Sequence, residues 1–272
     1  MSDCPVQVQI LYKVSPLNLN SDPELESPVK AINNHHTITY MKKSILLSLL
    51  FFITHWGFSQ HFQPLPQGYY TNLRLACAHP DEVEILDLSN QGITELNDQI
   101  FRFPKLRELY LAGNELTELP WEIKRLENLQ ILTVSYNRLT EIPYELGSME
   151  SLRTLDLAGN HLEKLPYELS RLEHLEYLSV RDNQLTQLPY ELYKLDRLVT
   201  LDVGGNRLEK LPYEYSRMTS LSYFYAGHNR LTRIPYEFGK LVNLRQLDLE
   251  GNEIDRIPDE IYDLPRLQVL KL

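Results

Sequence analysis

Cysteine is almost absent from this chain, which has two, Cys4 and Cys77, in 272 residues. Two cysteines cannot build a disulfide framework or a thiolate zinc site, and we expect Cys77 to be a small buried apolar residue. Basic residues are also few, because 27 Lys and Arg stand against 37 Asp and Glu, giving a formal net charge of −10. Nucleic-acid binding needs clustered basic side chains, so we expect no nucleic acid among the partners.

The motifs of the common enzyme classes are missing as well. The sequence contains no HExxH, no G-x-S-x-G, no Walker loop and no G-x-G-x-x-G. His161, His174 and His228 are scattered along the chain and do not form a pattern of metal ligands. We therefore expect no catalytic activity, no cofactor and no metal.

The first sixty residues differ from the rest. Residues 1–40 are polar and without a period, which predicts a disordered extension. Residues 41–59 combine Met41-Lys42-Lys43, an apolar run from Ile45 to Ile53, and Gly57-Phe58-Ser59, the pattern of a signal peptide cleaved after Ser59. We therefore expect export to the periplasm, the cell surface or the medium.

Two alternatives stay open for this segment. Residues 44–58 would span about 22 Å as a helix, less than the roughly 30 Å hydrocarbon core, so we expect no stable membrane span. Either Met41 is the true start and residues 1–40 are not translated, or these residues form the cytoplasmic tail of an anchored protein. A cytoplasmic or membrane-anchored protein is thus the alternative to export.

From Val83 onward the chain repeats every 23 residues without insertion or deletion. Apolar residues recur eight, five and three residues before an asparagine, and Gln91 takes its place in the first copy. The asparagines are Asn114, Asn137, Asn160, Asn183, Asn206, Asn229 and Asn252. Each amide can both donate and accept, so we expect the asparagines to satisfy buried backbone groups between copies.

The repeat resembles the leucine-rich-repeat family, because "LRELYLAGNEL" and "LRTLDLAGNHL" match the pattern L-x-x-L-x-L-x-x-N-x-L. The resemblance covers residues 83–272, with eight full copies and the start of a ninth, and extends to bacterial exported members and Ras-suppressor-like scaffolds. It implies an α/β solenoid, a curved horseshoe with a parallel concave β-sheet and short helical or 3-10 turns on the convex side.

Elementary physics supports this architecture. The alternating x-L-x-L-x segment predicts a strand with one buried face. A proline in seven copies, Pro120 to Pro258, suits the first position of a helical turn, and Leu146 and Met149 should point inward from it. One copy cannot bury these side chains alone, so neighbouring copies must stack.

The two ends of the repeat domain differ. Residues 60–82 predict a linker and a cap helix, with Thr71 as N-cap and Pro80 ending the helix. The C-terminus stops at "LQVLKL", within a predicted strand, which would leave an uncovered edge. We expect either self-association through this edge or a truncated chain.

Partners of such proteins dock on the concave sheet, as the resemblance implies, and the register identifies its outward residues. Asp156, Asp202 and Asp248 recur every second copy, with aromatic residues between them. The candidate binding residues are Tyr110, Tyr136, Asp156, Tyr177, Asp182, Asp202, Tyr223, Tyr225, His228 and Asp248. We expect a protein or peptide partner; a cell-surface carbohydrate-binding or adhesion protein and an intracellular signalling adaptor are the alternatives.

A second aromatic column lies on the predicted convex side. Each member is followed by a glutamate, and the column comprises Trp121, Tyr144, Tyr167, Tyr190, Tyr213 and Tyr236. We expect tandem copying to have left this column, with the rings stacking on one another. A second contact face is the alternative.

N-terminal sequencing of the exported protein tests the signal peptide. Cleavage after Ser59 predicts Gln60 as the first residue. An exported protein that retains residues 1–40 would contradict this expectation and favour an anchored protein.

Overall fold

The computed structural model describes residues 9–10 and 66–272. The predicted signal peptide, the apolar stretch at residues 44–58, and all of the predicted extension except Gln9 and Ile10 lie outside the described residues. In the described part, no helix is both long and apolar enough to cross a membrane.

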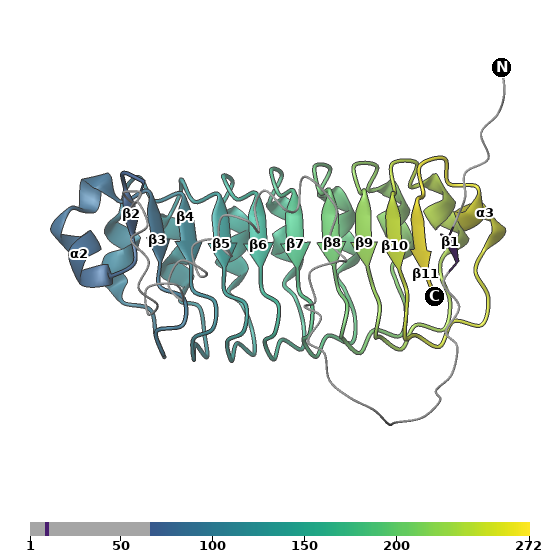
Figure 1. Cartoon of the computed structure of the whole chain (residues 1–272), viewed down its shortest axis with the longest axis horizontal. Coiled ribbons are helices and arrows are strands. Elements are labelled where there is room, and N and C mark those ends of the chain that lie inside the picture. Colours follow the sequence, from purple (N-terminus) through teal and green to yellow (C-terminus); the bar gives the residue numbers. More distant parts are fainter. Residues whose placement is uncertain (1–8, 11–65) are drawn as a thin grey trace, which may run out of the picture. The chain divides into compact units, whose positions relative to one another are not determined.

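The backbone of the fold is one parallel sheet of eleven strands in the order β1-β11-β10-β9-β8-β7-β6-β5-β4-β3-β2 (Figure 1). Each repeat strand pairs with the strand 23 residues further along, as Leu155 of β6 does with Leu178 of β7. The strands are β1 Gln9–Ile10, β2 Tyr69–Tyr70, β3 Ile85–Asp87, β4 Glu108–Tyr110, β5 Ile131–Thr133, β6 Thr154–Asp156, β7 Tyr177–Ser179, β8 Thr200–Asp202, β9 Tyr223–Tyr225, β10 Gln246–Asp248 and β11 Val269–Lys271.

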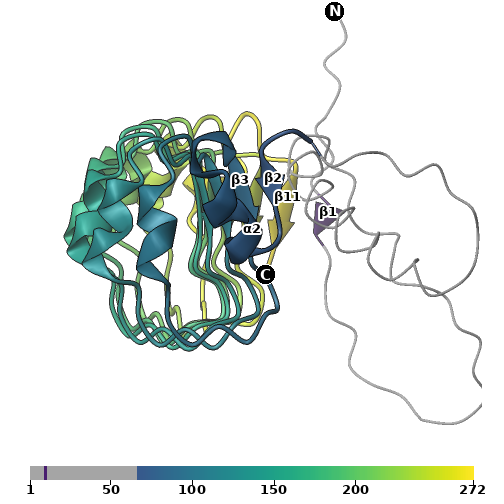
Figure 2. The same ribbon diagram turned by 90° about the vertical axis from the view of Figure 1, so that its left-hand side faces the viewer.

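Short helices form the layer opposite the sheet (Figure 2). They are η2 Asp98–Arg102, η3 Trp121–Arg125, η4 Tyr144–Ser148, η5 Tyr167–Arg171, η6 Tyr190–Lys194, η7 Tyr213–Arg217 and η8 Tyr236–Lys240, all 3-10 helices, and the α-helix α3 Asp259–Tyr262. The prolines lie one position earlier than expected. Each is the extended cap residue before its helix, as Pro143 is with φ −67° and ψ 140°. This backbone turns the chain into the helix and leaves the first helical position to the aromatic residue.

One continuous hydrophobic core fills the space between sheet and helices, from Ala76 to Leu270. The middle residue of each strand from β3 to β11 is buried, and so are the inward residues of the helices, including Leu146 and Met149 as predicted. In the ninth strand Phe224 replaces leucine, and its ring centroid lies 5.9 Å from that of Phe238 on η8. The core therefore keeps its packing across copies of unequal side chains.

The asparagine of each copy hydrogen-bonds to the copy before it. The Asn160 Oδ1 accepts from the Leu139 N–H at 3.0 Å, and its Nδ2 donates to the carbonyls of Val134 and Leu157, both at 3.0 Å. The other six asparagines repeat these three bonds in register. Because most of these groups are buried, each amide satisfies backbone atoms that water cannot reach.

The N-terminal end differs in detail from the expected cap. The helix α2 spans Leu73–Ala78, and its N-cap is Asn72, whose side chain accepts from the Leu75 N–H, rather than Thr71. A 3-10 helix, η1, follows at Pro80–Glu82, and β2 adds a strand before the first repeat. Gln91 donates instead to the Thr71 carbonyl at 2.9 Å, so the first copy bonds to this cap.

The C-terminal strand β11 is not left uncovered. Its Val269 and Leu270 pair in parallel with Gln9 and Ile10 of β1. The expectation of an open edge was wrong because the unpaired backbone groups of an edge strand accept a further strand, here from the same chain.

Replacing one ladder asparagine tests its structural role. Asn160→Ala leaves the buried Leu139 N–H without its acceptor, while the Val134 and Leu157 carbonyls each keep one amide donor, from Asn137 and Asn183. The variant should lower the free energy of unfolding by about 1–3 kcal/mol. Urea unfolding followed by circular dichroism measures this loss. Asn128→Ala is the matched control, because the exposed Asn128 makes one bond, to the Pro104 carbonyl. Equal losses for the two variants would contradict the assignment.

Candidate functional site

The concave face is the side of the sheet that points away from the core, formed by the first and third residues of each strand. Most of its large side chains are half-buried rather than exposed, including Tyr177, Tyr223 and Tyr225. The small residues Ser179 and Thr200 are buried, with exposed fractions of 2% and 8%. The face is therefore a packed layer of side chains, less open than the sequence predicted.

The aspartates at the ends of alternate strands also shape the backbone. The Asp156 Oδ1 accepts from the Ala158 N–H at 3.1 Å, and the Asp202 Oδ1 accepts from the Gly204 N–H at 3.0 Å. Asp87 and Asp248 make the same bond two residues ahead. One carboxylate oxygen thus stabilises the turn after the strand, and the second oxygen is free for other contacts.

Asp156, Asp202, Tyr177 and Tyr225 form a cluster across β6, β7, β8 and β9, which we call the Asp–Tyr cluster. Burial raises the pKa of the Asp202 carboxyl to about 6, although the Gly204 N–H and Arg181 oppose the shift. Burial likewise raises the pKa of Asp156. The pKa of the Tyr177 hydroxyl is raised by burial and then by the charges of both aspartates, which places Tyr177 between them electrostatically.

Asp248 has a closer cation than Asp156 or Asp202 has. Its Oδ2 lies 2.8 Å from the Lys271 Nζ, and the two residues are register partners on β10 and β11. The register partners of Asp156 and Asp202 are Ser179 and Tyr225, which carry no positive charge. Arg181 approaches Asp202 only to 3.9 Å and lies closer, at 3.2 Å, to Asp182. The two aspartates of the cluster are therefore poorly compensated.

The residue before each repeat marker lies in the left-handed region in all eight copies. Glycine occupies four of these positions, and the others hold Asn90, Tyr136, Asp182 and His228 with φ between 53° and 58°. Non-glycine residues adopt this conformation at a cost of roughly 1–2 kcal/mol. Tyr136, Asp182 and His228, predicted as binding residues, are exposed here, along one rim of the concave face.

The alternation of glycine with larger residues along this rim has a steric cause. A Cβ on Gly159 would lie 2.6 Å from the Tyr136 ring, and one on Gly251 would lie 2.5 Å from the His228 Nδ1. A large side chain in one copy thus occupies the space over the backbone of the next, which must be glycine. This contact explains why these positions repeat every two copies.

Of the remaining predicted residues, Asp182 shares Arg181 with Asp202, and Tyr223 and Asp248 lie near Tyr225, whose pKa their charges raise. Tyr110 on β4 donates to the Glu108 Oε2 at 2.7 Å, in a separate contact near the N-terminal end. Arg181 and Lys271 were not predicted from the sequence as residues of the concave face. Lys271 could have been found, because it stands 23 residues after Asp248 in the same column.

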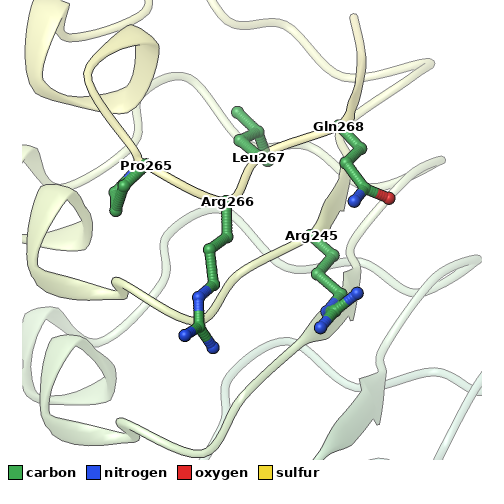
Figure 3. A pocket seen from close by; sticks show the side chains of 5 residues that line it. All are labelled: Arg245, Pro265, Arg266, Leu267 and Gln268. Carbon is green, nitrogen blue, oxygen red and sulfur yellow. The ribbon is translucent and has the colours of Figure 1, made fainter. Parts of the chain in front are cut away.

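Two other features of the described residues concern metal and ligand binding. In residues 66–272, no group of three or more His, Cys, Asp or Glu side chains is arranged to hold a metal ion. A hollow of about 520 Å³ lies beside β10 and β11, lined by Arg245, Pro265, Arg266, Leu267 and Gln268. Figure 3 shows both arginines extending in the same direction, but Arg266 already donates to the Asn243 Oδ1 at 2.6 Å. This exposed hollow lies outside the Asp–Tyr cluster.

The raised pKa of Asp202 predicts a pH-dependent stability. Because its pKa is higher in the folded state than its usual 3.8, its contribution is greatest below pH 4 and is lost as the pH rises through about 6. Asp202→Asn keeps the oxygen that accepts from Gly204 and removes the charge. It should raise the free energy of unfolding at pH 8 by at most about 3 kcal/mol, and by little at pH 4.

Urea unfolding at several pH values measures this difference. Asp196→Asn makes the same change in net charge at an exposed position and should leave the pH profile unaltered. A variant at Asp202 that gains no stability at pH 8 would show that the carboxylate is not destabilised by its surroundings.

Family models match most of the repeat region. The model described as "Leucine-rich repeat region" matches residues 166–272, and the model described as "Leucine rich repeat" matches residues 81–139 and 104–162. A comparison with curated proteins found no match.

Solved structures of leucine-rich-repeat proteins are similar to this chain. A leucine-rich-repeat protein of Leptospira interrogans is 33% identical with a TM-score of 0.69, over 75% of this chain and 58% of that protein. Internalin C2 of Listeria monocytogenes is 25% identical with a TM-score of 0.65, over 72% and 84%. The leucine-rich-repeat ectodomain of the receptor kinase GASSHO1/SCHENGEN3 of Arabidopsis thaliana, solved with CASPARIAN STRIP INTEGRITY FACTOR 2, is 28% identical with a TM-score of 0.58, over 70% and 27%.

The chain thus spans less than two thirds of the length of the Leptospira and Arabidopsis proteins. The matched models, the 23-residue register and the asparagine ladder agree with one another along residues 81–272. The chain belongs to the leucine-rich-repeat family.

Proposed function

We propose that this chain binds a protein or peptide partner on its concave face, through a basic side chain that docks at the Asp–Tyr cluster. The observation that carries the proposal is the contrast between the aspartates. Asp248 has the Lys271 Nζ at 2.8 Å, whereas Asp156 and Asp202 have uncharged register partners. A lysine or arginine of a partner would supply Asp156 and Asp202 with the close cation that Asp248 has in Lys271.

The surroundings of the cluster favour such a contact. Burial raises the pKa of both aspartates, so an incoming cation stabilises carboxylates that water solvates poorly. Tyr177 and Tyr225 flank the carboxylates with aromatic area, and tyrosine is enriched among the residues that dominate binding energy. Charge and aromatic area together suit a basic side chain with a long apolar stem.

The similar structures support a binding role outside the cell. The plant receptor was solved as an ectodomain in complex with CASPARIAN STRIP INTEGRITY FACTOR 2, although this chain spans only 27% of it. Together with the signal peptide proposed at residues 41–59, this favours an exported interaction module over an intracellular adaptor. Self-association through β11 would have to compete with β1 for the same edge.

Binding should depend on both carboxylates. The full chain serves as bait for extracellular proteins, and the captured partner is then titrated against variants. Asp156→Asn with Asp202→Asn keeps both turn-stabilising oxygens and should weaken binding at pH 7.5 by at least about tenfold. Because Asp202 has a pKa of about 6, native affinity should also fall as the pH drops below 6.

Glu150→Gln with Glu173→Gln is the control, since it removes the same charge from two exposed residues off the concave face. A partner that binds both double variants equally well would exclude the Asp–Tyr cluster as its site. A glycan array run in parallel tests the carbohydrate alternative. Glycan binding that the aspartate variants abolish, with no protein captured, would replace the proposal by that alternative.

A further inference from the structure

A regular series of exposed aromatic residues lies on the helical side of the solenoid, opposite the concave face. Tyr144, Tyr167, Tyr190, Tyr213 and Tyr236 each begin a 3-10 helix and are 53–62% exposed. Each is followed by a half-buried glutamate, from Glu145 to Glu237. We call these five pairs the Tyr–Glu row. Exposed apolar area of this regularity is uncommon on a protein surface that binds nothing.

The local backbone explains why the rings are held outward. The proline before each helix is extended, and the third residue of each helix points into the core, as Leu169 does. Tyr167 therefore stands on the outer side of its helix. The adjacent Glu168 raises the pKa of Tyr167, and the following glutamate does the same at Tyr144, Tyr190 and Tyr213. Ring and carboxylate therefore lie close together in these copies.

The rings do not stack on one another, contrary to the expectation from tandem copying. Among the described residues, the aromatic pair in contact is Phe224 with Phe238, inside the core. A hollow of about 490 Å³ lies instead beside two members of the row, Tyr167 and Tyr190, and its lining also includes Glu191 and Lys164. The faces of the rings are available to a ligand.

Trp121, which precedes the five tyrosines in the same convex column, indicates the chemistry of that ligand. Trp121 has two cations of its own helix above its ring, with the Lys124 Nζ at 4.9 Å and the Arg125 Cζ at 5.5 Å from the centroid. Within residues 66–272, no cation lies over any of the five tyrosines of the row. In the same described region, none of the five glutamates takes part in an ion pair.

We propose that the Tyr–Glu row binds an extended polypeptide segment rich in lysine and arginine. Each pair offers a ring face and a carboxylate, the two groups that attract an arginine or lysine head. In an extended chain, every second side chain points to the same side, at a spacing of about 6.6 Å. This spacing is of the same order as the distance between successive copies, whose strands lie roughly 4.8 Å apart. Alternate basic residues of one segment can therefore reach successive pairs.

This surface is separate from the one in the proposed function, because it lies on the other layer of the solenoid (Figure 2). A partner on the concave face would leave the Tyr–Glu row accessible. The net charge of −10 also attracts any polycation, so the test must separate local from general attraction.

The probe is a labelled synthetic peptide that alternates arginine with serine, titrated against the full chain by fluorescence anisotropy. Glu168→Gln with Glu191→Gln should weaken its binding about tenfold, and Tyr167→Leu with Tyr190→Leu several-fold. Glu150→Gln with Glu173→Gln removes the same charge off the row and should change affinity less than about twofold. A peptide with glutamine in place of arginine should not bind. Circular dichroism confirms that each variant is folded.

Three outcomes would overturn the proposal. The first is an equal loss of peptide affinity in both glutamate double variants, which would mean that the peptide is attracted by the general negative charge. The second is a loss of peptide affinity in the Asp156→Asn, Asp202→Asn double variant and not in the glutamate variants of the row. This result would assign the peptide to the concave face and would not contradict the proposed function. The third is a neutral oligosaccharide that binds and depends on the tyrosines but not on the glutamates.

Discussion

The structure depends on the hydrogen bonds that each repeat asparagine makes with the preceding copy. Three bonds from one side chain satisfy an N–H and two carbonyls at the turn after the strand, most of them buried. Backbone groups at such turns have no regular secondary structure to pair with, and leaving them unpaired in the core is costly. A copy shifted by one residue would lose the two bonds to the preceding copy, at Leu139 and Val134, and would turn its leucines outward. The asparagines therefore hold the period at 23 residues.

A fixed period has consequences for every other position. Residues 23 apart become neighbours in space, so each column of the sequence becomes a row on the surface. On the rim of the concave face, the Tyr136 ring occupies the space that a side chain at position 159 would need, and this position is a glycine. On the concave face, it brings Asp156 and Asp202 to either side of Tyr177. The two-copy alternation is thus at least partly enforced by contact and is not only a trace of duplication.

The sequence was sufficient for the features that repeat, since the strand register, the buried leucines and the 3-10 helices follow from a pattern sustained over eight copies. It was insufficient where the outcome depends on neighbouring side chains. Half-burial of the aspartates arises from the size of adjacent residues such as Tyr177 and Tyr225, which no single copy encodes. The N-cap at Asn72 rather than Thr71 is a choice between adjacent residues of similar capping strength. The pairing of β1 with β11 joins residues from opposite ends of the chain, beyond the reach of any local pattern.

Both proposed surfaces share one arrangement, in which a copy near one end of the repeat domain supplies its own close cation. Lys271 compensates Asp248 near the C-terminal end, and Lys124 with Arg125 covers Trp121 near the N-terminal end. Both copies still have neighbours on two sides, because β10 lies between β9 and β11 and η3 packs between η2 and η4. In the copies between them, Arg181 reaches Asp202 only at 3.9 Å, and within residues 66–272 no cation lies over the five tyrosines of the Tyr–Glu row. A binding surface confined to the central copies can diverge without disturbing the ends, which would let one rigid scaffold present both of the proposed faces.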